Sequence, residues 1–410
     1  MTAWSERTLG ELCALRAGIV FKPADQGLEF GDVPFIKVSD MNLASNAIAI
    51  REANNWVNDD YVARVRAKPF PAGTTVFAKI GEALRQNRVR KIVRATLVDN
   101  NMMGAIPNLS VVLPEFLYYR LASFDIASTA TGTALPYLTV STLERQRFRI
   151  PPRSLQRRIA SILSAYDDLI ENNTRRIAIL EEMARRLYEE WFVRFRFPGH
   201  KGVRMVKSEL GLVPEGWSVQ GLYDVADLTY GFPFRSKLFK ERGEGLGVIR
   251  IRDIRDDYTG TRTTEDVDPK YRVADGDILV GMDGAFHMGR WAGGVAWLNQ
   301  RVVRFRPKVG IPWAWLFWVT KEPIKTLEAT IVGTTVAHLS ARDLKEMRVL
   351  VPSKAVLELA ASVLEPMNEL ELKLKKKNAN LQTTRDLLLP KLISGELDVS
   401  SLPEPQALAA

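Results

Sequence analysis

The chain has 410 residues, one cysteine and a formal net charge of +9. This length exceeds what one core normally organises, so two or three domains are expected, and 46% hydrophobic residues exclude wholesale disorder. The positive charge favours a polyanionic partner such as nucleic acid without proving one. Cys13 alone cannot form an internal disulfide and suits a reducing cytoplasm, and no segment fits a signal peptide or a membrane span.

Residues 1–150 are expected to form a first mixed domain. A strand-like alternation in PFIKVSDMN ends at Ser39 and Asp40, which are typical turn residues. Pro114 precedes an aromatic run and marks the start of a short helix.

Residues 151–193 are expected to form one long helix, because Ser154 to Phe192 contain no Gly or Pro. Apolar residues recur every three or four positions, and acidic residues precede basic ones by one turn on the opposite face. The pattern fits either a core helix of a large domain or one strand of a coiled coil. A partner helix is needed to decide between them.

The second half of the chain repeats the first. Gly18 matches Gly231, Asp40 matches Asp253, Gly81 matches Gly284, and TGTALPYLTVSTL matches VGTTVAHLSARDL. The repeat predicts a connector without regular structure at 194–216, a second domain at 217–351 with a short helix near Pro312, a second long helix within 352–398 and a flexible tail at 399–410. The second helix is expected to end before Pro390.

The two long helices are therefore partners for each other, and antiparallel pairing gives a pseudo-twofold molecule. Parallel pairing is not excluded by the sequence.

Four motifs carry a resemblance to a known family. They are TGTALPYLTVSTLERQRFRIPPRSLQRRIASILSAYDDLIE, the helix exit YEEWFVRFRFPG, the re-entry ELGLVPEGW, and LLLPKLISGELDV. With these motifs, the chain resembles over essentially its whole length the specificity subunit of a type I restriction-modification system. The resemblance implies an α+β fold with two mixed α/β target recognition domains, separated by two long helices that form an antiparallel coiled coil with an internal pseudo-twofold repeat.

The resemblance also implies function. Each target recognition domain would read one half of a bipartite site in double-stranded DNA. The helices would be a spacer and a docking surface for two methyltransferase subunits, with docking expected at Gln156, Arg157, Ile159 and Leu163. Restriction subunits with translocase activity would join the assembly. S-adenosylmethionine, ATP and Mg²⁺ are expected only in the partner subunits.

The second unit departs from the motif, with Ala337, Ser353 and Leu357 where the first has Pro136, Pro152 and Gln156. These differences leave open whether both helix starts contact methyltransferase subunits equivalently.

The residues predict no catalytic or metal site. The chain lacks the Asn/Asp-Pro-Pro-aromatic motif that holds a flipped base, and it lacks a P-loop. The three histidines are far apart in the sequence, with no cysteine near them. The glycines of GMDGAFHMG, at 281–289, are better explained by strand turns than by a nucleotide-binding loop. We therefore expect a non-catalytic subunit.

Arginine suits guanine and phosphate, and Gln and Asn suit adenine edges, so the basic stretch from Lys79 to Arg94 is the first candidate for DNA contacts. Its counterpart in the second half carries different side chains, as two different half-sites require. The DNA-binding candidates are Lys22, Lys37, Ser39, Lys79, Arg85, Gln86, Asn87, Arg88, Arg90, Lys91, Tyr230, Arg235, Arg250, Arg252, Asp283, His287, Arg290 and Trp291. A solvated basic loop is the alternative for any one of them.

A second interpretation of the whole chain is a standalone structural or regulatory DNA-binding protein, whose helices pair with another copy. A nuclease with an unrecognised site is a third.

Overall fold

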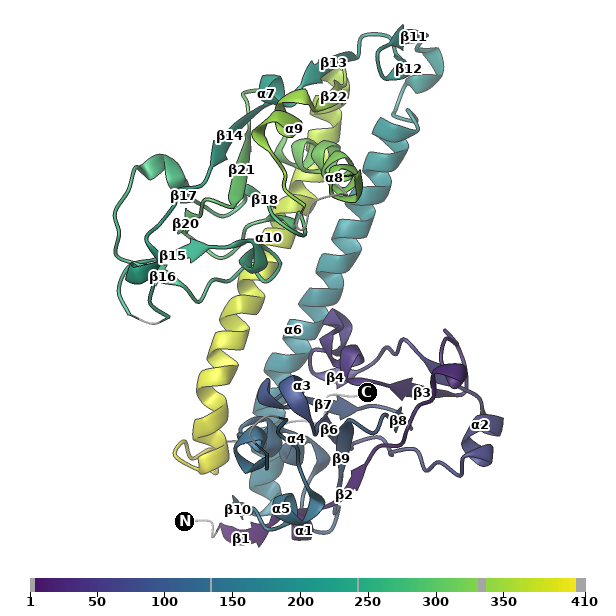
Figure 1. Cartoon of the computed structure of the whole chain (residues 1–410), viewed down its shortest axis with the longest axis vertical. Helices are drawn as coiled ribbons and strands as arrows, with labels where there is room; N and C mark the ends of the chain where they lie inside the picture. Colours follow the sequence, from purple (N-terminus) through teal and green to yellow (C-terminus); the bar gives the residue numbers. More distant parts are fainter. Residues whose placement is uncertain (1–3, 133–134, 242, 331–336, 403–410) are drawn as a thin grey trace. The chain divides into compact units, whose positions relative to one another are not determined.

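A computed structural model describes residues 4–132, 135–241, 243–330 and 337–402 (Figure 1). The chain divides into two compact units, Met1–Glu171 with Asn380–Ala410 (unit 1) and Asn172–Ala379 (unit 2). Each unit contains one globular part and one segment of each long helix, α6 (Arg153–Tyr188) and α10 (Lys354–Ser394).

The helix segments run antiparallel within each unit. In unit 2, Asn173 Nδ2 donates to Asn378 Oδ1 at 2.9 Å, whereas Ala184, further along α6, shares a core with Leu364, nearer the start of α10. In unit 1, Arg385 donates to Asp167 at 2.8 Å. The apolar stripes are thus buried between the helices and the globular parts, and the predicted coiled-coil pairing is confirmed in its antiparallel form.

Helix α10 does not end before Pro390, as the sequence had indicated. It continues through Pro390 to Ser394, where Gly395, with φ +80°, follows as a C-terminal cap. Leu392 and Ile393 in this last turn are buried in the core of unit 1, and their burial offsets the backbone hydrogen bond that proline cannot make. Helix α6 instead ends in a π-helical turn, Glu189–Val193.

Unit 1 contains a five-stranded sheet of order β2-β9-β6-β7-β4, a three-stranded sheet β5-β3-β8 and the pair β1-β10. Its strands are β1 (Ser5–Thr8), β2 (Cys13–Ala17), β3 (Val33–Ile36), β4 (Ala49–Ile50), β5 (Trp56–Val57), β6 (Thr75–Ala78), β7 (Val89–Ile92), β8 (Leu97–Val98), β9 (Met102–Pro107) and β10 (Arg147–Ile150). Its helices are α1 (Leu9–Leu12), α2 (Asp59–Arg64), α3 (Gly81–Arg85), α4 (Pro114–Ala122), α5 (Val140–Glu144) and the 3₁₀ turns η1 (Pro23–Asp25), η2 (Val38–Asn42), η3 (Ala44–Asn46) and η4 (Ile126–Thr129).

The five-stranded sheet is buried on both faces. Neighbouring residues of a strand point to opposite faces, so Phe77 packs with α4 and the start of α6, whereas Val76 packs in a separate core with Ile36 and Met41. Cys13 lies in the first core, and burial raises the pKa of its thiol to about 12. Cys13 is therefore a buried core residue.

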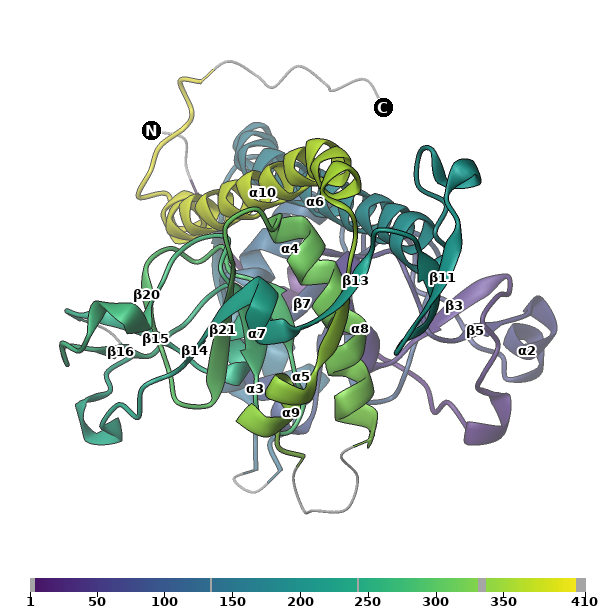
Figure 2. The ribbon, with the colours of Figure 1, turned by 90° about the horizontal axis from the view of Figure 1, so that it is seen from above.

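Unit 2 contains sheets of order β14-β21-β18-β19 and β16-β15-β20-β17, and the pairs β13-β22 and β11-β12. Its strands are β11 (Met205–Ser208), β12 (Gly211–Pro214), β13 (Ser218–Gly221), β14 (Ala226–Tyr230), β15 (Leu246–Ile249), β16 (Arg262–Thr263), β17 (Arg272–Val273), β18 (Ile278–Gly281), β19 (Met288–Arg290), β20 (Ala296–Leu298), β21 (Val302–Pro307) and β22 (Arg348–Val351). Its helices are α7 (Leu222–Val225), α8 (Trp313–Thr330), α9 (Ala341–Glu346) and the 3₁₀ turns η6 (His200–Gly202), η7 (Ser236–Leu238), η8 (Ile251–Ile254) and η9 (Pro269–Tyr271). Helices α7, α8 and α9 and strands β14 and β21 lie on one side of α10 (Figure 2).

The internal repeat is confirmed by the topology. The order β2-β9-β6-β7 in unit 1 corresponds to β14-β21-β18-β19 in unit 2, and β5-β3-β8 corresponds to β16-β15-β20. The matched glycines make the same close approach: a Cβ on Gly18 would lie 2.0 Å from Asp99 O, and a Cβ on Gly231 would lie 1.9 Å from Asn299 O. Only glycine fits there, which explains the sequence match.

Three local expectations differ from the structure. The connector contains the β11-β12 hairpin. Helix α8 has 18 residues, includes Pro323 and is not short. Val399, assigned by the sequence to the tail, is buried in the core of unit 1, and residues 403–410 lie outside the described part of the chain.

Candidate nucleic-acid interface

The candidate DNA-binding hairpin is β6–β7 with the residues between them in unit 1, and β18–β19 with the turn between them in unit 2. The two hairpins are held by the same backbone hydrogen bonds, which we call their common frame. In unit 1, Gly81 has φ +69° and donates to Pro136 O at 2.9 Å, and Leu138 N donates to Lys79 O. In unit 2, Gly284 also has φ +69° and donates to Ala337 O at 2.9 Å, and Leu339 N donates to Met282 O. The frame is conserved within the repeat while the side chains on it differ. The glycine-rich segment of unit 2 is the β18–β19 turn, as expected.

In unit 1, four of the predicted residues share one cleft. Gln86, Asn87, Arg88 and Arg90 line a cavity of about 480 Å³ whose other walls come mainly from α4, α6 and α10. Arg385 of α10 and Tyr118 of α4 also line it. The sequence did not suggest these two, because they come from helices whose local patterns indicate only packing.

Other members of the basic stretch have structural partners. Asn87, with φ +48°, donates to Phe124 O at 2.8 Å and accepts from Ile126 N at 3.0 Å, so its amide is not available to read a base. Lys91 lies over the Tyr118 ring, 5.0 Å from its centroid. Arg85 is exposed beside Glu82, and Lys79 is half-buried after β6.

The 3₁₀ turns η2, after β3, and η8, after β15, lie against the β6–β7 and β18–β19 segments of their units. Arg90 Nη2 donates to Met41 O in η2 at 3.1 Å, and η8 contacts β18 and β19. These turns are held by buried Asp40 and Asp253, which accept from Lys37 N at 2.6 Å and Arg250 N at 2.9 Å.

The candidates on these turns therefore lie near the hairpins. Ser39 and Arg252 are exposed, Lys37 donates to Gln26, and the Arg250 guanidinium lies over Phe239.

The remaining candidates of unit 2 that stay accessible have defined neighbours. His287 is in the β18–β19 turn, and burial, with Arg255 nearby, lowers its pKa, so its ring is neutral at pH 7. Asp283 contacts His338 at 2.6 Å and Arg301 at 3.2 Å.

Three candidates lie away from these hairpins. Tyr230 is hydrogen-bonded to Tyr223 at 2.8 Å, Arg235 is paired with Glu265, and Lys22 is exposed before η1 in unit 1. None of the three belongs to the β6–β7 or β18–β19 segment, and Tyr230 is in β14, separated from β18 by β21.

Two predicted DNA contacts of unit 2 are wrong. Trp291 is 1% exposed, and its Nε1 donates to Gly294 O at 2.6 Å. Arg290 is 5% exposed and forms a buried ion pair with Glu371 of α10. Their position beside a turn suggested exposure, but the pleat of β19 directs Arg290 inward.

Three of the four predicted docking residues are also contradicted, because their side chains are buried in unit 1. Gln156 is 1% exposed, and it accepts from Leu113 N at 2.9 Å and donates to Val111 O and Pro151 O at 3.0 Å. Ile159 and Leu163 lie in the core, whereas Arg157 is exposed. Leu357, which replaces Gln156 in unit 2, is buried as well, so this difference concerns packing.

Replacing Gln156 by Ala is expected to lower the free energy of unfolding by about 2–4 kcal/mol, because Leu113 N and two buried carbonyls lose a partner. Thermal or urea unfolding of the full chain measures this. Arg157→Ala on the same turn is the control and should change stability by less than about 0.5 kcal/mol. An equal, small effect of both substitutions would contradict the structural role of Gln156.

The described residues contain no group of three His, Cys, Asp or Glu side chains placed to hold a metal. Among the same residues, no helix is long and apolar enough to cross a membrane.

The fold and the interface define a duplicated protein in which two α+β units present different polar side chains on one common frame. A family model described as "Type I restriction modification DNA specificity domain" matches residues 1–182 and again 214–382. The chain belongs to this family, which confirms the resemblance seen in its sequence.

Relatives are similar over most of the chain. The chain is 24% identical over 391 residues to the type I restriction enzyme MjaIX specificity subunit of Methanocaldococcus jannaschii, covering 91% of this chain and 88% of that protein. It is also 24% identical over 374 residues to the HindI specificity subunit of Haemophilus influenzae, covering 73% of this chain and 81% of that protein. The crystal structure of a type I S subunit from M. genitalium has a TM-score of 0.58, at 16% identity and 97% coverage of both chains, which supports the fold.

Proposed function

We propose that this chain is the DNA-recognition subunit of a type I restriction-modification complex, and that each unit reads one half of a bipartite site in double-stranded DNA. The observation that carries the proposal is that the two hairpins share the same backbone hydrogen bonds but present different side chains. Gln86, Arg88 and Arg90 occupy the hairpin region of unit 1, whereas Asp283 and His287 occupy that of unit 2. Guanidinium, amide, carboxylate and imidazole groups select different base edges.

Among the other predicted residues, those with exposed side chains are the better candidates for contacts to phosphates or base edges. Arg85, Ser39 and Arg252 are exposed close to the hairpins and are the first choice, after Gln86 and Arg88, for contacts to DNA. Lys22 and Arg235 lie on separate loops, so their only contacts to DNA in this proposal are to phosphates.

The long helices act as the spacer between the two readings and carry the contacts to two methyltransferase subunits. In this proposal Arg157 stays the candidate contact on the first turns of α6, because it is exposed there. The chain itself is non-catalytic and works in the cytoplasm, where its DNA lies. S-adenosylmethionine, ATP and Mg²⁺ belong to the methyltransferase and restriction subunits.

Reconstitution tests this assignment. The purified chain alone should transfer no methyl group to DNA, and adding a cognate methyltransferase subunit should give a complex with two methyltransferase copies and sequence-dependent transfer. Light scattering with and without that subunit separates this function from a standalone DNA-binding protein that pairs with its own copy. Methyl transfer or magnesium-dependent cleavage by the single chain would contradict the proposal.

A further inference from the structure

A half-buried arginine of unit 1, Arg120, has no counter-ion among the residues that the structure describes. The guanidinium carbon of Arg120, in the last turn of α4, lies 4.4 Å from the Phe148 ring centroid, and Nη1 donates to Ser123 Oγ at 3.0 Å. Its Nε is buried without a hydrogen-bond partner among the described residues. Burial alone lowers its pKa, with no described carboxylate close enough to oppose this effect. A partly buried cation normally has an anionic partner, so an anion from outside the chain would complete this site.

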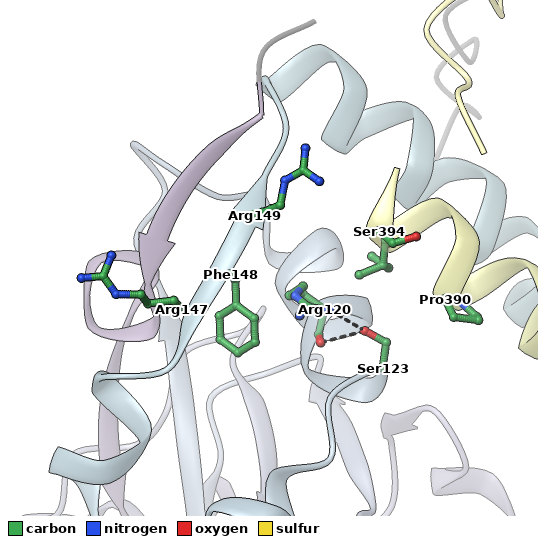
Figure 3. A pocket seen from close by; sticks show the side chains of 8 residues that line it. Arg120, Ser123, Arg147, Phe148, Arg149, Pro390 and Ser394 are labelled. Atoms are coloured by element: carbon green, nitrogen blue, oxygen red, sulfur yellow. Dashed lines mark hydrogen bonds between the residues drawn. The ribbon is translucent and has the colours of Figure 1, made fainter. Parts of the chain in front are cut away.

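The arginine lines an open pocket of about 340 Å³ between β10 and the end of α10 (Figure 3). The lining residues are Arg120, Ser123, Arg147, Phe148, Arg149, Pro390, Ile393 and Ser394, and none of them is acidic. Arg149 lies on the side of β10 that faces the end of α10, and its guanidinium carbon is 5.7 Å from the centroid of the Trp4 ring. Its guanidinium makes no hydrogen bond to a described residue, whereas its backbone belongs to the β1–β10 pair. Arg147 points away from α10 and is near Glu6, at 3.5 Å.

Unit 2 has apolar residues at the equivalent positions. Lys91 lies over Tyr118 and Tyr119, and Arg290 lies over Phe317, so Arg120 corresponds to Trp318 or Val319. The pairs Ser5↔Ile150 and Ser218↔Val351 align β10 with β22, so Arg149 corresponds to Leu350.

Trp318 and Val319 are both buried in the core of unit 2, and Leu350 is partly buried against it. The fold therefore does not need two arginines at these positions, and they are specific to unit 1. Arg147, by contrast, corresponds to Arg348.

We propose that this pocket binds a phosphate group through Arg120 and Arg149. Ser123 Oγ donates its own hydrogen to Arg120 O at 3.0 Å, so the donors left for a ligand are those of the two guanidinium groups that line the pocket. Several N–H donors of this kind suit a tetrahedral anion with multiple acceptor oxygens. The pocket adjoins the hairpin of unit 1, because Phe124, next to Ser123, accepts from Asn87. Resting on the proposed function, the phosphate is one of the DNA backbone beside the half-site that unit 1 reads, and it fixes register without selecting bases.

Arg149→Gln tests the pocket, with Arg147→Gln as the matched control on the same strand. Both side chains are exposed, so both variants should fold, as thermal unfolding would verify. The full chain, assembled with its methyltransferase subunits, is titrated with duplex DNA at several salt concentrations. Arg149→Gln should reduce the slope of log K against log[salt] by about 0.9, the contribution of one phosphate, with the same bases recognised. Arg147→Gln should leave the slope unchanged. Equal slopes for Arg149→Gln, Arg147→Gln and wild type would overturn the DNA contact.

Titration of the full chain with inorganic phosphate, without DNA, distinguishes the two sources of phosphate. Phosphate binding that is lost in Arg149→Gln and in Arg120→Gln, but kept in Arg147→Gln, supports the pocket. This support stands even if the complex fails to bind a bipartite duplex, because that failure would refute only the proposed function. The pocket is refuted if neither phosphate nor DNA distinguishes Arg149→Gln from Arg147→Gln, or if a glutamate-rich peptide occupies it in preference to phosphate.

Discussion

Replacing Arg290 by Met is expected to lower the free energy of unfolding by about 3–5 kcal/mol, because Glu371 then remains as a buried charge without its main partner. Both side chains are 5% exposed. Lys375 lies 3.3 Å from Glu371 but is shared with Asp257 at 3.2 Å, so it compensates only in part. Urea unfolding of the full chain measures the loss.

The double variant Arg290→Met with Glu371→Leu should recover most of this stability. Nε and Nη1 of Arg290 have no hydrogen-bond partner among the described residues, so the native pair is imperfectly satisfied, and an apolar pair of similar volume is a close substitute. Arg252→Met, at a neighbouring exposed position, is the control and should leave stability unchanged. A change of recognised bases by Arg290→Met without loss of stability would restore Arg290 as a DNA contact.

Replacing Gly231 by Ala is expected to destabilise the protein by about 3 kcal/mol or more, since the new methyl group meets fixed backbone. The nearest atoms are Asn299 O at 1.9 Å and Leu298 O at 2.8 Å, and neither can rotate away. Gly18→Ala should have a similar effect, with Asp99 O at 2.0 Å. Denaturant unfolding followed by circular dichroism measures both.

Gly202→Ala is the matched control in unit 2, because a Cβ there meets nothing within 4 Å and its φ is not positive. It should be neutral or slightly stabilising. If Gly231→Ala were as well tolerated as Gly202→Ala, the close approach of the backbone after β14 to the backbone after β20 would be wrong.

The architecture was predictable because the chain is duplicated. Matching glycines, such as Gly18 and Gly231, mark places where backbone approaches backbone, and such places must coincide in two copies of one fold. The long helix was predictable from its apolar period and its lack of Gly and Pro. The end of α10 was not, because a local rule about Pro390 was overridden by tertiary burial of Leu392 and Ile393.

The site was less predictable, because the burial of a side chain depends on contacts with helices and strands that are distant in the sequence. Arg290 and Arg252 look alike in sequence, yet one faces Glu371 of α10 and the other is exposed. Gln156 looks like a surface residue at a helix start, but the backbone amide of Leu113 occupies its carbonyl. The contribution of Tyr118 and Arg385 to the cleft of unit 1 depends on contacts between segments far apart in the chain.

Sequencing of methylated adenines in cells that co-express this chain with its neighbouring methyltransferase gene tests the central claim most directly. We expect one bipartite motif, two short specified halves separated by a gap of fixed length, because two units on one pair of helices read the DNA. Substituting Gln86 and Arg88 should alter only the half of the motif that unit 1 reads. An unsplit motif, or methylation that does not depend on this chain, would contradict the account.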